Sequence, residues 1–100
     1  MKSGFNIEWT NEALNNLDSV IEYLAVKWTD REIKNFFKKL DRSLNIISKN
    51  PFAFPSSNLK LKVRRCVLSK QTTIYYEIKY NAIVILTLFD NRKLPYSIKL

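Results

Sequence analysis

The sequence predicts an α+β fold in which one strand and a helical hairpin precede an antiparallel three-stranded meander. Three observations lead to this class: apolar residues alternate near the start of the chain, recur every three or four positions through its middle, and alternate again toward its end. The 100 residues contain no internal repeat and no long linker, and 46% of them are hydrophobic. We therefore predict one domain that spans residues 1–100.

The first strand is predicted in the segment GFNIEWT, where Phe5, Ile7 and Trp9 alternate with polar residues. The period then changes to three and four, which predicts an amphipathic helix over about residues 11–28. Thr10 or Asn11 is placed to cap its first turn. The apolar residues of this helix are Leu14, Leu17, Ile21, Leu24 and Trp28.

A second helix is predicted over about residues 30–49. It begins at TDRE, where Thr29 and Glu32 have the spacing of a capping box, and Pro51 follows its end. Because the connection between the helices is so short, they should form an antiparallel hairpin whose apolar stripes share one core. The facing residues would be Leu14, Leu17, Ile21 and Leu24 on the first helix and Phe37, Leu40 and Leu44 on the second.

Three strands are predicted after the loop NPFAFPSSN, over residues 59–68, 73–80 and 82–89. Their connections, SKQT and YN, are short enough for hairpins, so the strands should form a meander with the helices packed on one face. The sequence leaves the pairing partner of the first strand open. The tyrosines expected to pack between neighbouring strands are Tyr75, Tyr76 and Tyr80.

Cys66 is the single cysteine, and the chain contains no histidine. No internal disulfide can therefore form, and cysteine and histidine cannot build a zinc site. We expect Cys66 to be a buried hydrophobe rather than a nucleophile, and we expect no metal and no cofactor. The chain has no apolar run of about 20 residues, and its start lacks the apolar core of a signal peptide, which favours a cytoplasmic protein without a membrane partner.

The net charge of +8 is concentrated in the second half of the chain. Residues 1–57 carry eight Lys and Arg against seven Asp and Glu, a net charge of +1, whereas residues 58–100 carry nine against two, a net charge of +7. Such a field favours acidic proteins or nucleic acid as partners. A solvated cationic face without a partner is the alternative.

The basic residues of this second half supply the candidates for target binding. Lys60, Lys62 and Arg64 share one face of the predicted strand if its alternation holds. Arg92 follows the last strand, which runs into the sequence DNRK, and it could reach the same sheet surface. The full candidate set is Lys60, Lys62, Arg64, Arg65, Arg92 and Lys93.

These candidates also have structural interpretations. The lysines would protect an edge strand from aggregation. Arg65 could pair with Glu77 or Asp90, and Asp90 could serve only to anchor Arg92 or the turn. Arg92 is the residue that we most readily assign to function, because the core strand before it would act as a rigid support.

The chain resembles the RelE/ParE superfamily of bacterial type II toxins over nearly its whole length. The resemblance is carried, in order, by EWTNEALNNLDSVIEYLAVKW, NPFAFP, VRRCVL, IYYEI and ILTLFDNRKLP. The helical hairpin with IEYL and KW is more similar to the ParE branch than to the RelE branch. The resemblance implies an acidic antitoxin as partner, and as target either DNA gyrase for ParE-like toxins or ribosome-bound mRNA for RelE-like ones.

Cleavage of RNA would need a base, a proton donor and cations that stabilise charge on the phosphate. The candidate catalytic residues are Arg64, Arg92 and Tyr96, the last from a loose match to the C-terminal tyrosine of RelE. The absence of histidine excludes the histidine-using ribonucleases of the family as a template. We predict a growth-arresting, ParE-like inhibitor of DNA gyrase. The alternatives are a RelE-like, ribosome-dependent mRNA endonuclease and, more weakly, a small basic regulator that binds nucleic acid.

Overall fold

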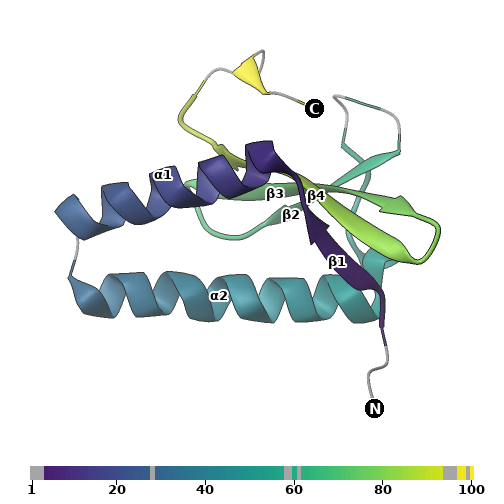
Figure 1. Cartoon of the computed structure of the whole chain (residues 1–100), viewed down its shortest axis with the longest axis horizontal. Helices are drawn as coiled ribbons and strands as arrows, with labels where there is room; N and C mark the ends of the chain where they lie inside the picture. The colour runs from purple at the N-terminus through teal and green to yellow at the C-terminus, as the bar shows by residue number, and fades with distance from the viewer. Residues whose placement is uncertain (1–3, 28, 58–59, 61, 94–96, 99) are drawn as a thin grey trace.

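The computed structural model describes residues 4–27, 29–57, 60, 62–93, 97–98 and 100, and it has the predicted α+β class. Figure 1 shows two long helices that lie side by side in antiparallel directions next to a twisted sheet. Within the described residues, no helix is both long and apolar enough to cross a membrane. The elements are, in chain order, β1 (Asn6–Trp9), α1 (Asn11–Lys27), α2 (Asp30–Lys49), the short 3-10 helix η1 (Pro51–Ala53), β2 (Val63–Val67), β3 (Thr72–Lys79) and β4 (Ala82–Asp90).

The sheet has the strand order β1-β4-β3-β2. The last three strands form the predicted antiparallel meander, in which Ile74 of β3 lies between Cys66 of β2 and Leu88 of β4. β1 pairs with β4 in parallel, with Ile7 opposite Ile83. A parallel pair needs a long crossover connection, and the helices together with β2 and β3 provide it.

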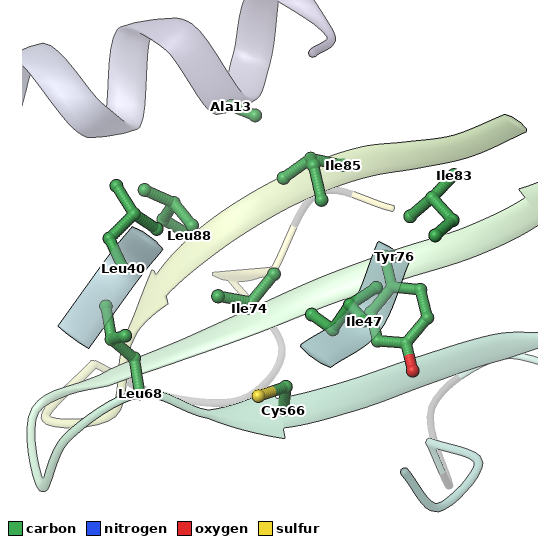
Figure 2. Close-up of a cluster of buried hydrophobic side chains, with 10 residues drawn as sticks. All are labelled: Ala13, Leu40, Ile47, Cys66, Leu68, Ile74, Tyr76, Ile83, Ile85 and Leu88. Carbon is green, nitrogen blue, oxygen red and sulfur yellow. The ribbon is translucent and has the colours of Figure 1, made fainter. Parts of the chain in front are cut away.

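The main core lies between the helices and one face of the sheet, as Figure 2 shows. Its strand residues alternate along the chain, so that Ile74 and Tyr76 both point toward the helices. Cys66 is buried in this core, as predicted, and burial raises the pKa of its thiol. The buried members are Ala13, Leu40, Ile47, Cys66, Leu68, Ile74, Tyr76, Ile83, Ile85 and Leu88.

A smaller apolar cluster occupies the opposite face of the sheet. Tyr75 and Phe89 meet there edge to face, with ring centroids 6.4 Å apart. Tyr75 and Tyr76 thus confirm the predicted strand packing on the two faces, whereas the prediction for Tyr80 was wrong. Tyr80 is 100% exposed, because it lies in the turn between β3 and β4 with a φ of 54°. The cluster comprises Val63, Tyr75 and Phe89, with Leu86, Ile98 and Leu100 packed against it.

The apolar stripe of the helices is rotated relative to the prediction. Leu14 is 44% exposed and Phe37 is 37% exposed, so these two predicted core contacts were wrong. Ala13 is instead fully buried, and its small side chain lets α1 approach the sheet closely, which turns Leu14 outward. Leu40 is buried as predicted, and Trp28 lies outside the described residues. The half-buried helical residues packed against the core are Leu17, Phe36 and Leu44.

β2 begins at Val63, four residues later than predicted. Lys62 has a φ of 74°, a left-handed conformation that ends the strand alternation before it reaches Lys60. Part of the outer edge of β2 is covered by the preceding segment, since Arg65 donates its N–H to the Pro55 carbonyl at 3.1 Å. The prediction of one strand face shared by Lys60, Lys62 and Arg64 was therefore wrong; Leu59 and Leu61, which belonged to that strand, lie outside the described residues.

The two helix caps differ in their side-chain hydrogen bonds. Thr10 Oγ1 accepts the N–H of Ala13 at 3.1 Å and lies 2.9 Å from the Ile85 carbonyl and 3.1 Å from the Leu86 carbonyl. Thr10 therefore caps α1, as predicted, and also joins it to β4. Thr29 is the N-cap of α2, but its side chain makes no capping bond, so the predicted capping box is not formed.

We expect Thr10→Ala to lower the free energy of unfolding by about 1–2 kcal/mol, because it removes the cap and the link to β4 together. Thr29→Ala makes the same chemical change without losing a capping bond, and it should cost less than about 0.5 kcal/mol. Urea unfolding of both variants measures the difference. Equal losses in the two variants would contradict this role for Thr10.

Candidate functional site

A groove of about 560 Å³ opens where β4 ends, between that end of the sheet and the two helices. α1 contributes Tyr23 to its wall, α2 contributes Phe36, and the turn after β4 contributes Arg92. The helices extend past the described strands of the sheet in Figure 1. Side chains from three elements therefore surround a space that opens to solvent.

Asn16 of α1 closes the edge of β4 inside this groove. β1 pairs with β4 only from Ala82 to Ile85. Beyond Ile85, β4 is paired with β3 on one edge, and among the described residues no strand lies along its other edge. The Asn16 side-chain oxygen accepts the Leu88 N–H at 3.1 Å and the Thr87 hydroxyl at 2.6 Å. A helix side chain thus replaces the missing strand at this position.

Sequence reasoning missed Asn16, although the sequence contains a signal. Asn16 lies three residues after the buried Ala13, so it is on the face of α1 that packs toward the sheet. A polar side chain on such a face needs hydrogen-bond partners. Its amide nitrogen also donates to the Glu12 carboxylate at 3.1 Å, so both ends of the Asn16 side chain are bonded.

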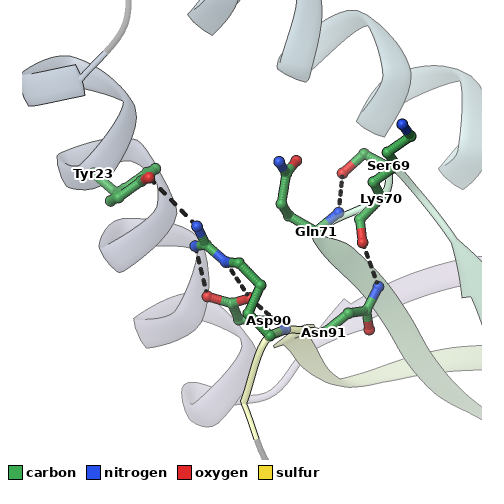
Figure 3. A network of polar contacts seen from close by, with 7 residues as sticks. Tyr23, Ser69, Lys70, Gln71, Asp90 and Asn91 are labelled. Carbon is green, nitrogen blue, oxygen red and sulfur yellow. Dashed lines mark hydrogen bonds and ion pairs between the residues drawn. The ribbon is translucent and has the colours of Figure 1, made fainter.

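Arg92 lines the groove and is held there by Asp90 and Tyr23, which Figure 3 labels at the end of β4 and on α1. Its Nε and Nη2 donate to the two carboxylate oxygens of Asp90 at 3.0 and 2.8 Å, and its backbone N–H donates to the same carboxylate at 2.9 Å. Nη1 lies 3.4 Å from the Tyr23 hydroxyl, and the guanidinium carbon lies 5.2 Å from the centroid of the Tyr23 ring. Asp90 therefore does anchor Arg92, as one of the two interpretations of this sequence expected.

Asp90 and Arg92 each stabilise the charged form of the other. The hydrogen bonds from the Arg92 side chain hold the pKa of the Asp90 carboxyl below its ordinary value. The same bonds, with the contact to Tyr23, raise the pKa of Arg92 above its ordinary value. Asp90 is thus a stable anionic partner at neutral pH, and it fixes the direction of the guanidinium.

The turn that carries Arg92 is tied to the neighbouring hairpin. Asn91 donates its backbone N–H to the Gln71 carbonyl at 2.7 Å and its side-chain N–H to the Lys70 carbonyl at 3.2 Å. Its side-chain oxygen accepts the Thr73 hydroxyl at 2.8 Å. These bonds join the loop before β3 to the turn after β4, which carries Arg92.

Arg64, on β2, is part of a different arrangement, with the segment that connects α2 to β2. Its Nη1 donates to the Phe54 carbonyl at 2.6 Å, and its guanidinium carbon lies 5.2 Å from the Phe52 ring centroid. Nearby, Tyr76 donates its hydroxyl to the Pro51 carbonyl at 2.7 Å, and burial raises the pKa of Tyr76 to about 12. Arg64 and Tyr76 thus attach the η1 segment to the sheet.

Arg64 and Arg92 do not share a site. Arg64 lies opposite Tyr76, which lies opposite Ile85, and Arg92 follows Ile85 by seven residues. β4 ends at Asp90, five residues after Ile85, so at about 3.3 Å per strand residue the end of β4 that carries Arg92 is roughly 16 Å from Arg64 along the sheet. The expectation that Arg92 reaches the sheet surface of Arg64 was therefore wrong.

The remaining predicted site residues are spread over the surface. Lys60 donates to the Leu100 carbonyl at 3.1 Å, and Lys62 is exposed before β2. Arg65 is exposed on β2; of its two expected partners, Glu77 pairs with Lys79 at 3.9 Å and Asp90 with Arg92 at 2.8 Å. Lys93 is exposed and lines the groove beside Arg92. Tyr96 lies outside the described residues.

Over the part of the chain that the structure describes, no three Asp, Glu, Cys or His side chains are grouped closely enough to hold a metal ion. The site consists instead of hydrogen-bond donors, carboxylates and aromatic rings. Such a set can bind another molecule through charge and apolar contact.

Comparison with solved structures places this fold among bacterial toxins. The chain is similar to a structure of the chromosomal ParDE toxin-antitoxin system from P. aeruginosa, with a TM-score of 0.73 and 15% identity over 86% of this chain and 95% of that one. It is similar to the toxin-antitoxin complex DinJ-YafQ from E. coli, with a TM-score of 0.66 and 9% identity over 92% and 98% of the two chains. It is also similar to the YoeB dimer from S. aureus, with a TM-score of 0.59 and 19% identity over 87% and 97%.

Sequence comparison shows the family. The sequence model described as "ParE toxin of type II toxin-antitoxin system, parDE" matches residues 7–95. The chain therefore belongs to the ParE toxin family of type II toxin-antitoxin systems, and the predicted membership of the RelE/ParE superfamily is confirmed. No curated protein matches the chain.

Proposed function

We propose that this toxin arrests growth in the cytoplasm by binding and inhibiting DNA gyrase, not by cutting RNA. Membership of the ParE family supports this target. The observation that carries the proposal is the separation of Arg64 from Arg92, each of which is bonded to its own structural partners. Stabilising a single scissile phosphate would require both cations within a few ångströms of it.

Two described groups that could transfer protons, the thiol of Cys66 and the hydroxyl of Tyr76, also favour inhibition by binding. The Cys66 thiol is buried with a raised pKa, and the Tyr76 hydroxyl donates to the Pro51 carbonyl with a pKa of about 12. Both groups are poor bases near neutral pH and neither faces the groove. The chain contains no histidine that could replace them.

The proposed gyrase-binding surface consists of the exposed cations next to β2. Lys62 and Arg65 are exposed there, and Lys60 lies two residues before Lys62. These residues belong to the half of the chain with a net charge of +7, which would steer the toxin toward an acidic surface.

We further propose that an acidic antitoxin neutralises this toxin. The similar structures include a ParDE system and a DinJ-YafQ toxin-antitoxin complex. A net charge of +8 favours an acidic partner, and a segment that folds on binding could add its apolar side chains to the groove.

Inhibition of gyrase supercoiling by the purified toxin tests the function. The parent protein should inhibit supercoiling, and a Lys62→Glu, Arg65→Glu variant should require at least about fivefold more protein, since charge reversal opposes electrostatic steering. The matched control is Lys38→Glu, Arg42→Glu, which reverses two exposed charges on α2 outside the groove. Thermal unfolding of all three proteins checks that each is folded.

The same proteins should be added to a translation reaction with ribosomes and mRNA. We expect no codon-specific cleavage by the parent. Cleavage by the parent, abolished in Arg64→Ala or Arg92→Ala, would overturn the proposal in favour of a ribosome-dependent endonuclease.

A further inference from the structure

We propose that Arg92, positioned by Asp90 and Tyr23, is a preformed receptor for one carboxylate of the antitoxin. The inference rests on the antitoxin partner proposed above and assigns this groove to it. It separates the antitoxin site at the end of β4 from the cations beside β2.

Arg92 has hydrogen-bond donors left for a ligand carboxylate. A guanidinium carries five N–H donors in a planar fork. Asp90 occupies Nε and one position of Nη2, and the Tyr23 hydroxyl lies 3.4 Å from Nη1. The outer edge, formed by Nη1 and Nη2, retains donors for a second carboxylate in the paired geometry that arginine favours.

The position of the guanidinium is already fixed. Tyr23 lies against its face, Asp90 holds its inner edge, and the Asn91 hydrogen bonds fix the turn beneath it. The Arg92 side chain nevertheless remains 54% exposed and lines the groove. A ligand carboxylate would thus meet a cation whose side-chain entropy is largely lost before binding.

The charges of the groove favour a peptide over nucleic acid. Among the described residues that line it, the acidic and basic side chains are equal in number, although the chain as a whole carries +8. A phosphate backbone would meet repulsion from the carboxylates, whereas a peptide can place one acid at Arg92 and keep other charges away. The charged lining residues are Glu12, Glu32, Asp90, Lys39, Arg92 and Lys93.

The shape of the groove favours an antitoxin segment over the surface of a large folded enzyme. The groove lies between two helices and a strand end, and its wall includes the apolar side chains of Val20, Leu24 and Phe36. A single chain segment that folds on binding can insert apolar side chains between helices. The occupant that we infer therefore has apolar residues beside an Asp or Glu.

Titration calorimetry of the toxin with the product of an adjacent reading frame, tested as the candidate antitoxin, checks this inference. Arg92→Ala should weaken binding about tenfold or more, since a charge-assisted paired hydrogen bond is lost. Arg92→Lys should restore little of the affinity, because an ammonium cannot bind Asp90 and the ligand as a planar fork. Arg42→Ala removes an exposed arginine of α2 outside the groove and should leave the affinity unchanged.

A double-mutant cycle identifies the acid. Each Asp or Glu of the antitoxin is changed to Asn or Gln and measured against parent toxin and Arg92→Ala. For one Asp or Glu of the antitoxin, the substitution should weaken binding to the parent toxin but should not weaken binding to Arg92→Ala any further. Parent-like affinity in Arg92→Ala, or additive effects for every acid, would overturn the inference.

The gyrase assay keeps the two proposals distinguishable. If Arg92→Ala still inhibits supercoiling but the antitoxin no longer relieves that inhibition, both proposals are supported. If the parent does not inhibit supercoiling, the proposed target is wrong, whereas the calorimetric result still decides the role of Arg92. Lost inhibition with unchanged antitoxin affinity would place Arg92 in the target surface and overturn the inference.

Discussion

Ile47→Ala is expected to lower the free energy of unfolding by about 2–5 kcal/mol, the usual cost of truncating a fully buried isoleucine. Ile47 is 0% exposed and lies in the main core near Tyr76, as Figure 2 shows. The loss combines the buried methyl and methylene groups with the cavity that they leave. Urea unfolding, monitored by circular dichroism, measures the change.

The preceding residue supplies a matched control. Ile46 is in the same helix and has the same side chain, but it is 44% exposed. Ile46→Ala should cost less than about 1 kcal/mol, because much of its apolar surface is already in contact with water. Similar losses for the two variants would mean that the orientation of α2 differs from the one described.

Asn16→Ala is expected to cost about 2–4 kcal/mol, because it leaves the N–H of Leu88 and the hydroxyl of Thr87 without their acceptor. Thr87 is 3% exposed and Leu88 4% exposed, so the lost oxygen leaves two mostly buried donors, and water from the groove that they line can recover only part of the bonding. The effect would also loosen the groove, because Asn16 fixes α1 against the free edge of β4. Hydrogen exchange of the Leu88 amide should accelerate in the variant.

Asn15 provides the comparison for this prediction. It is exposed on the same helix, and alanine has the higher helix propensity, so Asn15→Ala should change stability by less than about 0.5 kcal/mol. A stable Asn16→Ala with slow Leu88 exchange would show that another group bonds this edge of β4.

Because Arg64 has structural partners, an effect of Arg64→Ala on toxicity can come from lost stability. Its guanidinium bonds Phe54 and lies over Phe52, so Arg64→Ala should reduce stability as well as any activity. A loss of toxicity in that variant is therefore no evidence for catalysis unless its stability is measured with it. Arg42→Ala, which changes an exposed arginine, again serves as the control.

The sequence by itself determined the elements of this protein and most of their bounds. The helical period, the capping position of Thr10 and the position of Pro51 place α1 and α2 within one or two residues of their observed limits. The burial of Cys66 and the opposite faces of Tyr75 and Tyr76 also follow from local alternation. Each of these features depends on residues close together in the sequence, so the local pattern of apolar and polar residues is enough to predict it.

Only the tertiary structure decided which distant groups meet. Thr87 and Asn16 are 71 residues apart in the chain, and Tyr23 and Arg92 are 69 apart, so no local period could report either contact. The parallel pairing of β1 with β4 and the separation of Arg64 from Arg92 likewise depend on how the sheet is ordered. Hydrophobic patterns specify which face of an element is buried, whereas the partner of a polar side chain is set by the packing of elements far apart in sequence.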